Sequence, residues 1–81
     1  MVEERGIKMH ILSQDKLSIV NTKNLSIQTE IHNNAVTIYG ECNNITYDLG
    51  TYGNKKTVAW ILKNIYDFLL KGQEVFMMPE K

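Results

Sequence analysis

Residues 54–72 read NKKTVAWILKNIYDFLLKG and decide the fold of the chain. Apolar side chains recur in this stretch at intervals of three and four, at Val58, Ile61, Leu62, Ile65 and Leu69. That spacing places them on one face of an α-helix. Asn54 is a favourable N-cap, and Gly72 suits the left-handed backbone position that ends many helices. We therefore expect a helix over residues 55–71 whose apolar face is buried against the rest of the protein.

The residues before this helix follow a period of two. Between residues 25 and 31, apolar and polar side chains alternate, which is typical of a half-buried strand. Asn33-Asn34 suits a tight hairpin turn, because asparagine tolerates the left-handed backbone that such turns need. The same signals predict strands over residues 7–12, 17–20, 25–31, 35–39 and 45–49, with a turn over residues 40–44.

The predicted fold class is α+β. Four to five strands form an antiparallel meander sheet that packs on the single C-terminal amphipathic helix. The apolar tail over residues 75–78 can add a short final edge strand, offer an adaptable binding edge, or fill the core beneath the helix. At 81 residues the chain has room for one core, so we expect a single domain over residues 1–81, with residues 1–6 as a flexible N-terminal arm. A domain of this size gains stability from pairing with a copy of itself, so a homo-oligomer is expected.

The composition argues against several classes of function. Nine Lys and Arg balance nine Asp and Glu, and the resulting net charge of zero provides no broad attraction to nucleic acid or to an anionic membrane. The single cysteine, Cys42, suits a reducing compartment, and no apolar run is long enough to span a bilayer. The sequence therefore predicts a cytoplasmic protein with no membrane partner and no nucleic-acid partner.

No catalytic, metal or cofactor motif stands out in the sequence. His10 and His32 lie far apart without a second ligand at metal spacing, and Cys42 has no neighbouring histidine in sequence. The carboxylates are scattered over different turns and strands. We expect neither an enzyme nor a protein that binds a metal or a cofactor.

The loop before the helix, residues 50–57, is a candidate anion site. Two lysines stand in the first helical turn, where the helix dipole disfavours cations and free N–H groups can hold a phosphate. The candidate residues are Gly53, Asn54, Lys55, Lys56 and Thr57. The alternative interpretation is a plain strand-to-helix loop with solvated lysines, and the phosphate-loop pattern for ATP is not met.

Trp60 is a large aromatic residue on the polar side of the predicted helix. It shares that side with four polar residues, Lys56, Lys63, Asn64 and Asp67. Tryptophan is enriched at the centres of protein interfaces, so these five residues form a candidate interface. The other interpretation is that the N-terminal arm or the 75–78 tail folds over Trp60 within the same chain.

Three short motifs carry a resemblance over nearly the whole chain. They are Ser13-Gln14-Asp15 in a turn, Leu49-Gly50-Thr51-Tyr52 at a strand end, and Met78-Pro79 near the end of the sequence. With them the chain resembles a group of small uncharacterised proteins from Firmicutes chromosomes, prophages and phages. The resemblance implies a phage or mobile-element accessory protein that acts by binding, in some cases to host defence machinery.

Two hypotheses of function follow. The first is a small non-enzymatic binding module that acts through a protein–protein interface around Trp60, with a second copy or a host protein as the partner. The alternative is a binder of a nucleotide or another phosphorylated small ligand at residues 50–57.

Overall fold

The computed structural model describes residues 9–80, which form six strands and one helix. The elements are β1 (His10–Leu12), β2 (Ile19–Asn21), β3 (Ser26–His32), β4 (Ala35–Cys42), β5 (Ile45–Tyr52), α1 (Lys55–Leu70) and β6 (Val75–Met77). The predicted N-terminal arm and the start of the first predicted strand, at residue 7, lie outside the described residues.

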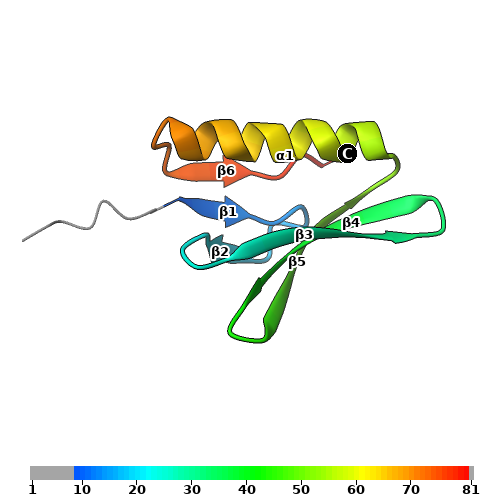
Figure 1. Cartoon of the computed structure of the whole chain (residues 1–81), viewed down its shortest axis with the longest axis horizontal. Coiled ribbons are helices and arrows are strands. Elements are labelled where there is room, and N and C mark those ends of the chain that lie inside the picture. The colour runs from blue at the N-terminus through cyan, green and yellow to red at the C-terminus, as the bar shows by residue number, and fades with distance from the viewer. Residues whose placement is uncertain (1–8, 81) are drawn as a thin grey trace, which may run out of the picture.

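The strands are divided between two three-stranded sheets. In the β2-β1-β6 sheet, β1 is antiparallel to β2 and parallel to β6, and in the β3-β4-β5 sheet the strands form an antiparallel meander. Figure 1 shows α1 along one side of the molecule with β6 directly beside it. The predicted α+β class, with mostly antiparallel strands packed on one C-terminal helix, is confirmed. The strands do not form the single predicted sheet, because β2 pairs only with β1 and β3 pairs only with β4; between β2 and β3 the chain passes through Asn24, which has a φ of 59°.

The strands β4 and β5 run further than the sequence pattern predicts. The predicted turn over residues 40–44 shrinks to Asn43-Asn44, where both residues have positive φ, 55° and 68°. Gly40 lies inside β4, where a Cβ would come within 2.9 Å of the Leu25 side chain. A bulge lies opposite Ile38 and Tyr39, so that Leu49 is an extra residue in β5 and lies in the core.

Both predicted ends of the helix are confirmed. The Asn54 side-chain oxygen accepts a hydrogen bond from the Thr57 N–H at 2.8 Å. Gly72 has a φ of 71°, and the N–H groups of Gly72 and Gln73 donate to the carbonyls of Leu69 and Phe68 at 3.2 and 3.0 Å. Within residues 9–80, no helix is long and apolar enough to cross a membrane.

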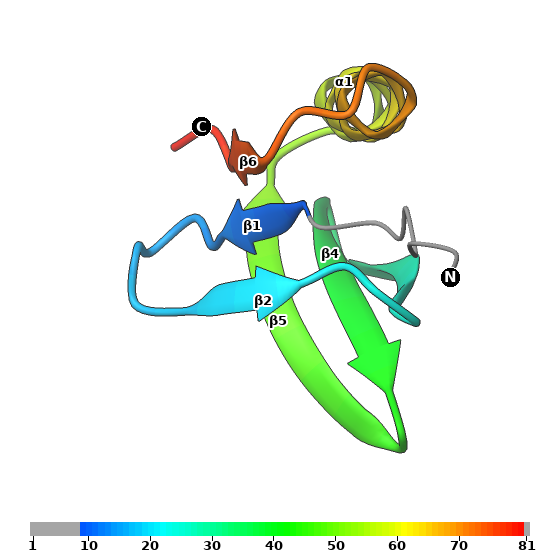
Figure 2. The ribbon, with the colours of Figure 1, turned by 90° about the vertical axis from the view of Figure 1, so that its left-hand side faces the viewer.

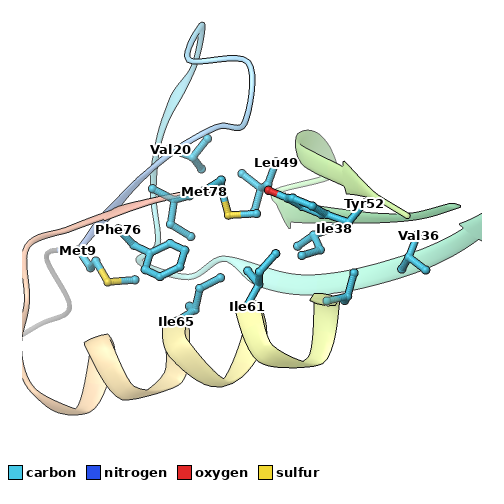
Figure 3. Close-up of a cluster of buried hydrophobic side chains, with 12 residues drawn as sticks. Met9, Val20, Val36, Ile38, Leu49, Tyr52, Ile61, Ile65, Phe76 and Met78 are labelled. Carbon is cyan, nitrogen blue, oxygen red and sulfur yellow. The ribbon is translucent and has the colours of Figure 1, made fainter. Parts of the chain in front are cut away.

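One core joins the helix to both sheets. Its buried residues are Met9, Ile11, Val20, Val36, Ile38, Leu49, Tyr52, Val58, Ile61, Ile65, Phe76 and Met78. Figure 3 shows Ile61 and Ile65 projecting from α1 toward Ile38 of β4 and Phe76 of β6. Leu62 and Leu69, which the spacing also assigned to the apolar face, are partly buried at its border.

Replacing Ile61 with alanine tests this packing. The side chain is fully buried, and Ile61→Ala should lower the free energy of unfolding by about 2–5 kcal/mol, because it leaves a cavity where the helix meets both sheets. Urea denaturation followed by circular dichroism measures the change. Ile45→Ala is the control, since Ile45 is 54% exposed at the far end of β5. Equal costs for the two substitutions would contradict the observed core.

Candidate interaction surface

Trp60 lies on the solvent-facing side of α1 with 59% of its surface exposed. At about 100° per residue, it lies about 80° around the helix axis from Phe68. The Phe68 ring packs edge-to-face on Phe76 of β6, with the ring centroids 5.0 Å apart. Trp60 therefore stands on the flank of the helix that borders β6. The described part of the C-terminal tail leaves Trp60 exposed, because Phe76 and Met78 are directed into the core; the arm over residues 1–6 lies outside the described residues.

The polar residues predicted to surround Trp60 lie on its side of the helix. Asn64 donates a side-chain hydrogen bond to the Trp60 carbonyl oxygen at 2.7 Å, and the Lys63 ammonium lies 3.4 Å from the Asp67 carboxylate. Lys56 is exposed one turn before Trp60. These contacts follow the helix axis, so the polar groups lie beside the indole ring without covering it.

Tyr66 marks the opposite flank of the helix. It is 62% exposed, comparable to Trp60, but lies about 120° around the axis on the side away from Phe68. Leu70 is exposed on that flank as well. Sequence reasoning did not single out these residues, although their position off the predicted apolar face could have revealed them.

The sequence pattern also missed an exposed apolar face on the β2-β1-β6 sheet. Ile19, Val75 and Met77 are all more than half exposed. The tail forms the predicted edge strand β6, and Phe76 and Met78 fill the core, whereas Met77 between them is exposed. The signal was present in the segments 17–20 and 75–78, which carry apolar residues on both faces of a strand.

The candidate anion loop forms an open turn. Gly53, Asn54, Lys55 and Lys56 are exposed, and Thr57 is half-buried. One of the free N–H groups of the first turn, that of Thr57, is occupied by the Asn54 side chain. Neither lysine forms an ion pair with another residue in the described range 9–80. The anion site stays a prediction from the sequence.

The three motifs behind the resemblance come together at one junction. The Gln14 side chain accepts a hydrogen bond from the Thr51 N–H at 2.9 Å, and its amide N–H groups donate to the Thr51 and Glu80 carbonyls at 3.0 and 2.9 Å. The Tyr52 hydroxyl donates to the Pro79 carbonyl at 2.6 Å. Gly50 must lack a side chain here, because a Cβ would come within 2.9 Å of the Tyr52 ring. The motifs therefore tie the turn after β1, the edge of β5 and the C-terminal tail to one another.

Two titratable groups at this junction are shifted. Hydrogen bonds from the Ser13 hydroxyl and the Leu17 N–H hold the pKa of Asp15 below its ordinary value of 3.8. Burial raises the pKa of Tyr52 to about 12. The shift of the Asp15 pKa follows from hydrogen bonds within the turn after β1, and that of the Tyr52 pKa from burial where its hydroxyl meets the tail.

Comparison with known proteins adds no relative: no family model, no curated protein and no solved structure matches the chain significantly. Over the residues that the structure describes, no group of three or more His, Cys, Asp or Glu side chains is arranged to hold a metal ion.

The Tyr52 hydroxyl gives a pH-dependent test of the junction. Tyr52→Phe should lower the free energy of unfolding by about 1 kcal/mol at neutral pH, because the Pro79 carbonyl loses its donor. The folded pKa of about 12 lies above the ordinary 10.0, so ionisation favours the unfolded chain. The stability that Tyr52 contributes is complete below pH 10 and is lost as the pH rises toward 12. Urea denaturation of both proteins should show their difference shrinking over that range, and a constant difference would contradict the assignment.

Proposed function

We propose that the chain is a non-enzymatic binding module whose protein interface is the flank of α1 around Trp60. The observation that carries the proposal is the 59% exposure of Trp60, the only tryptophan in the sequence, on α1. Tryptophan is among the residue types most enriched at interface hot spots, so its exposure on a helix supports a contact surface.

The surroundings of Trp60 support an interface more than an active site. Lys63 and Asp67 are paired with each other and the Asn64 amide bonds to the helix backbone, so these polar groups have partners on the side of the helix that carries Trp60. A hydrophobic centre with a satisfied polar rim is the usual anatomy of a protein interface. The partner is a host protein or a second copy of the chain, and the resemblance to phage and prophage proteins favours a host protein.

A matched pair of variants tests the proposal. Immobilised wild type, Trp60→Ala and Tyr66→Ala are exposed to a lysate of the native host, and the retained proteins are quantified by mass spectrometry. A partner should be retained by wild type and by Tyr66→Ala but fall at least about tenfold with Trp60→Ala, since a hot-spot truncation costs 2 kcal/mol or more. Sedimentation velocity applies the same comparison to self-association.

Circular dichroism of the three proteins provides the control for folding, and the spectra should agree because both aromatic side chains are exposed. If Trp60→Ala retains every protein that wild type retains and also sediments like wild type, the helix flank is not the interface.

A further inference from the structure

The outer face of the β2-β1-β6 sheet carries one apolar row across all three strands. Ile11, Val20 and Phe76 face the core, so the residues that alternate with them face away from it. Leu12 pairs in register with both Ile19 and Met77. In Figure 2, α1 and β4 lie to one side of this sheet. Because the buried side chains of the sheet face the core on that side, the alternating row faces the other way.

The row is open to solvent. Ile19 is 70% exposed and Met77 is 64% exposed, with half-buried Leu12 between them. The neighbouring row consists of Asn21, His10 and Val75. Leu17, in the turn that precedes β2, is also exposed. No Asp, Glu, Lys or Arg occupies any of the six face positions.

The outer face of the β3-β4-β5 sheet is polar and provides a comparison within the same chain. On the β3-β4-β5 sheet the corresponding positions carry Glu30, Glu41 and Asp48, together with Thr37 and Tyr39. Alternation of apolar inward and polar outward residues is the normal pattern for a solvated antiparallel sheet. The β3-β4-β5 sheet follows this pattern, whereas the β2-β1-β6 sheet departs from it. The apolar row on the β2-β1-β6 sheet therefore points to a partner that covers it.

We infer that two copies of this chain pack their β2-β1-β6 sheets face to face. A second copy presents the same uncharged row, so stacking the rows buries no unpaired charge. The rim beside Leu17 carries both signs, with the Lys16 ammonium 3.0 Å from the Glu80 carboxylate and Asp15 next to them. With a net charge of zero, two copies do not repel each other.

The geometry suits an interface with twofold symmetry. Stacked sheets lie about 10 Å apart, which is the space that two layers of aliphatic side chains fill. A standard interface buries about 800 Å² per partner, with an apolar centre and a polar rim. Here Ile19, Leu12, Met77 and Val75 form the apolar part of the face, while His10 and Asn21 add polar groups beside them.

The inference goes beyond the proposed function, because the sheet face is separate from the flank of α1. The helix packs on the inner face of the sheet, so a dimer through the outer face leaves Trp60 of each copy exposed. The dimer would then present two equivalent Trp60 surfaces, one on each outer side.

Sedimentation equilibrium of the full chain and three lysine variants tests the inference. Wild type should be a dimer that dissociates on dilution. Ile19→Lys and Met77→Lys should each raise the dimer Kd at least about 100-fold, because the ammonium group would be buried without a partner. Ile45→Lys is the matched control, since Ile45 is an isoleucine exposed on the other sheet, and it should dimerise like wild type.

Trp60→Ala separates this inference from the proposed function, since it should dimerise like wild type even when it no longer binds a partner. The inference is overturned by a wild type that stays monomeric at its highest soluble concentration, or by a dimer that persists in both Ile19→Lys and Met77→Lys. The inference is also overturned if the dimer is lost in Ile45→Lys or in Trp60→Ala but retained in Ile19→Lys, because the contact between the two copies would then lie elsewhere.

Discussion

The apolar face of α1 packs against both sheets. No strand pair joins the β2-β1-β6 sheet to the β3-β4-β5 sheet among the described residues, so their relative position depends on side-chain packing and on the junction where the Gln14 N–H donates to the Leu49 carbonyl at 2.8 Å. Ile61 and Ile65 contribute most, because they lie between Ile38 of one sheet and Phe76 of the other. A single helix can cover only one face of each sheet. The outer faces of both sheets are therefore left for water or for partners. That of the β2-β1-β6 sheet carries an apolar row, whereas that of the β3-β4-β5 sheet is polar.

The junction around Gln14 sets where the sheets meet. Its side-chain amide bonds both backbone groups of Thr51 and so occupies the edge of β5 much as a neighbouring strand would. The same amide reaches the Glu80 carbonyl, which fixes the end of the tail that forms β6. The three motifs around Gln14, Tyr52 and Pro79 thus have a structural role in this chain. Function has to be sought at the exposed surfaces.

Local signals in the sequence predicted most of the elements. The spacing from Val58 to Leu69, with Asn54 before it and Gly72 after it, predicted the helix to within one residue, because caps and periodicity depend on neighbouring residues only. Strand pairing depends on residues far apart in sequence, so neither the two sheets nor the parallel pairing of β6 with β1 could be foreseen.

The candidate surface was predictable only in part. The helical wheel predicted that Trp60 would lie off the buried face, which the structure confirms. The outer row of the β2-β1-β6 sheet was hidden, because Ile19-Val20 and Phe76-Met77 are apolar on both faces and the sequence does not say which face is covered.

Solvent accessibility of the isoleucine methyl groups tests the account most directly. Nuclear magnetic resonance of the methyl-labelled chain with a soluble paramagnetic agent reports which isoleucines meet water, and repeating it at high protein concentration reports which become covered. We predict that the methyl group of Ile19 is strongly relaxed in dilute solution and becomes protected on concentration, that Ile45 is relaxed at both concentrations, and that Ile11 and Ile61 are protected throughout. Protection of Ile19 in dilute solution, or no change in Ile19 on concentration, would contradict the account.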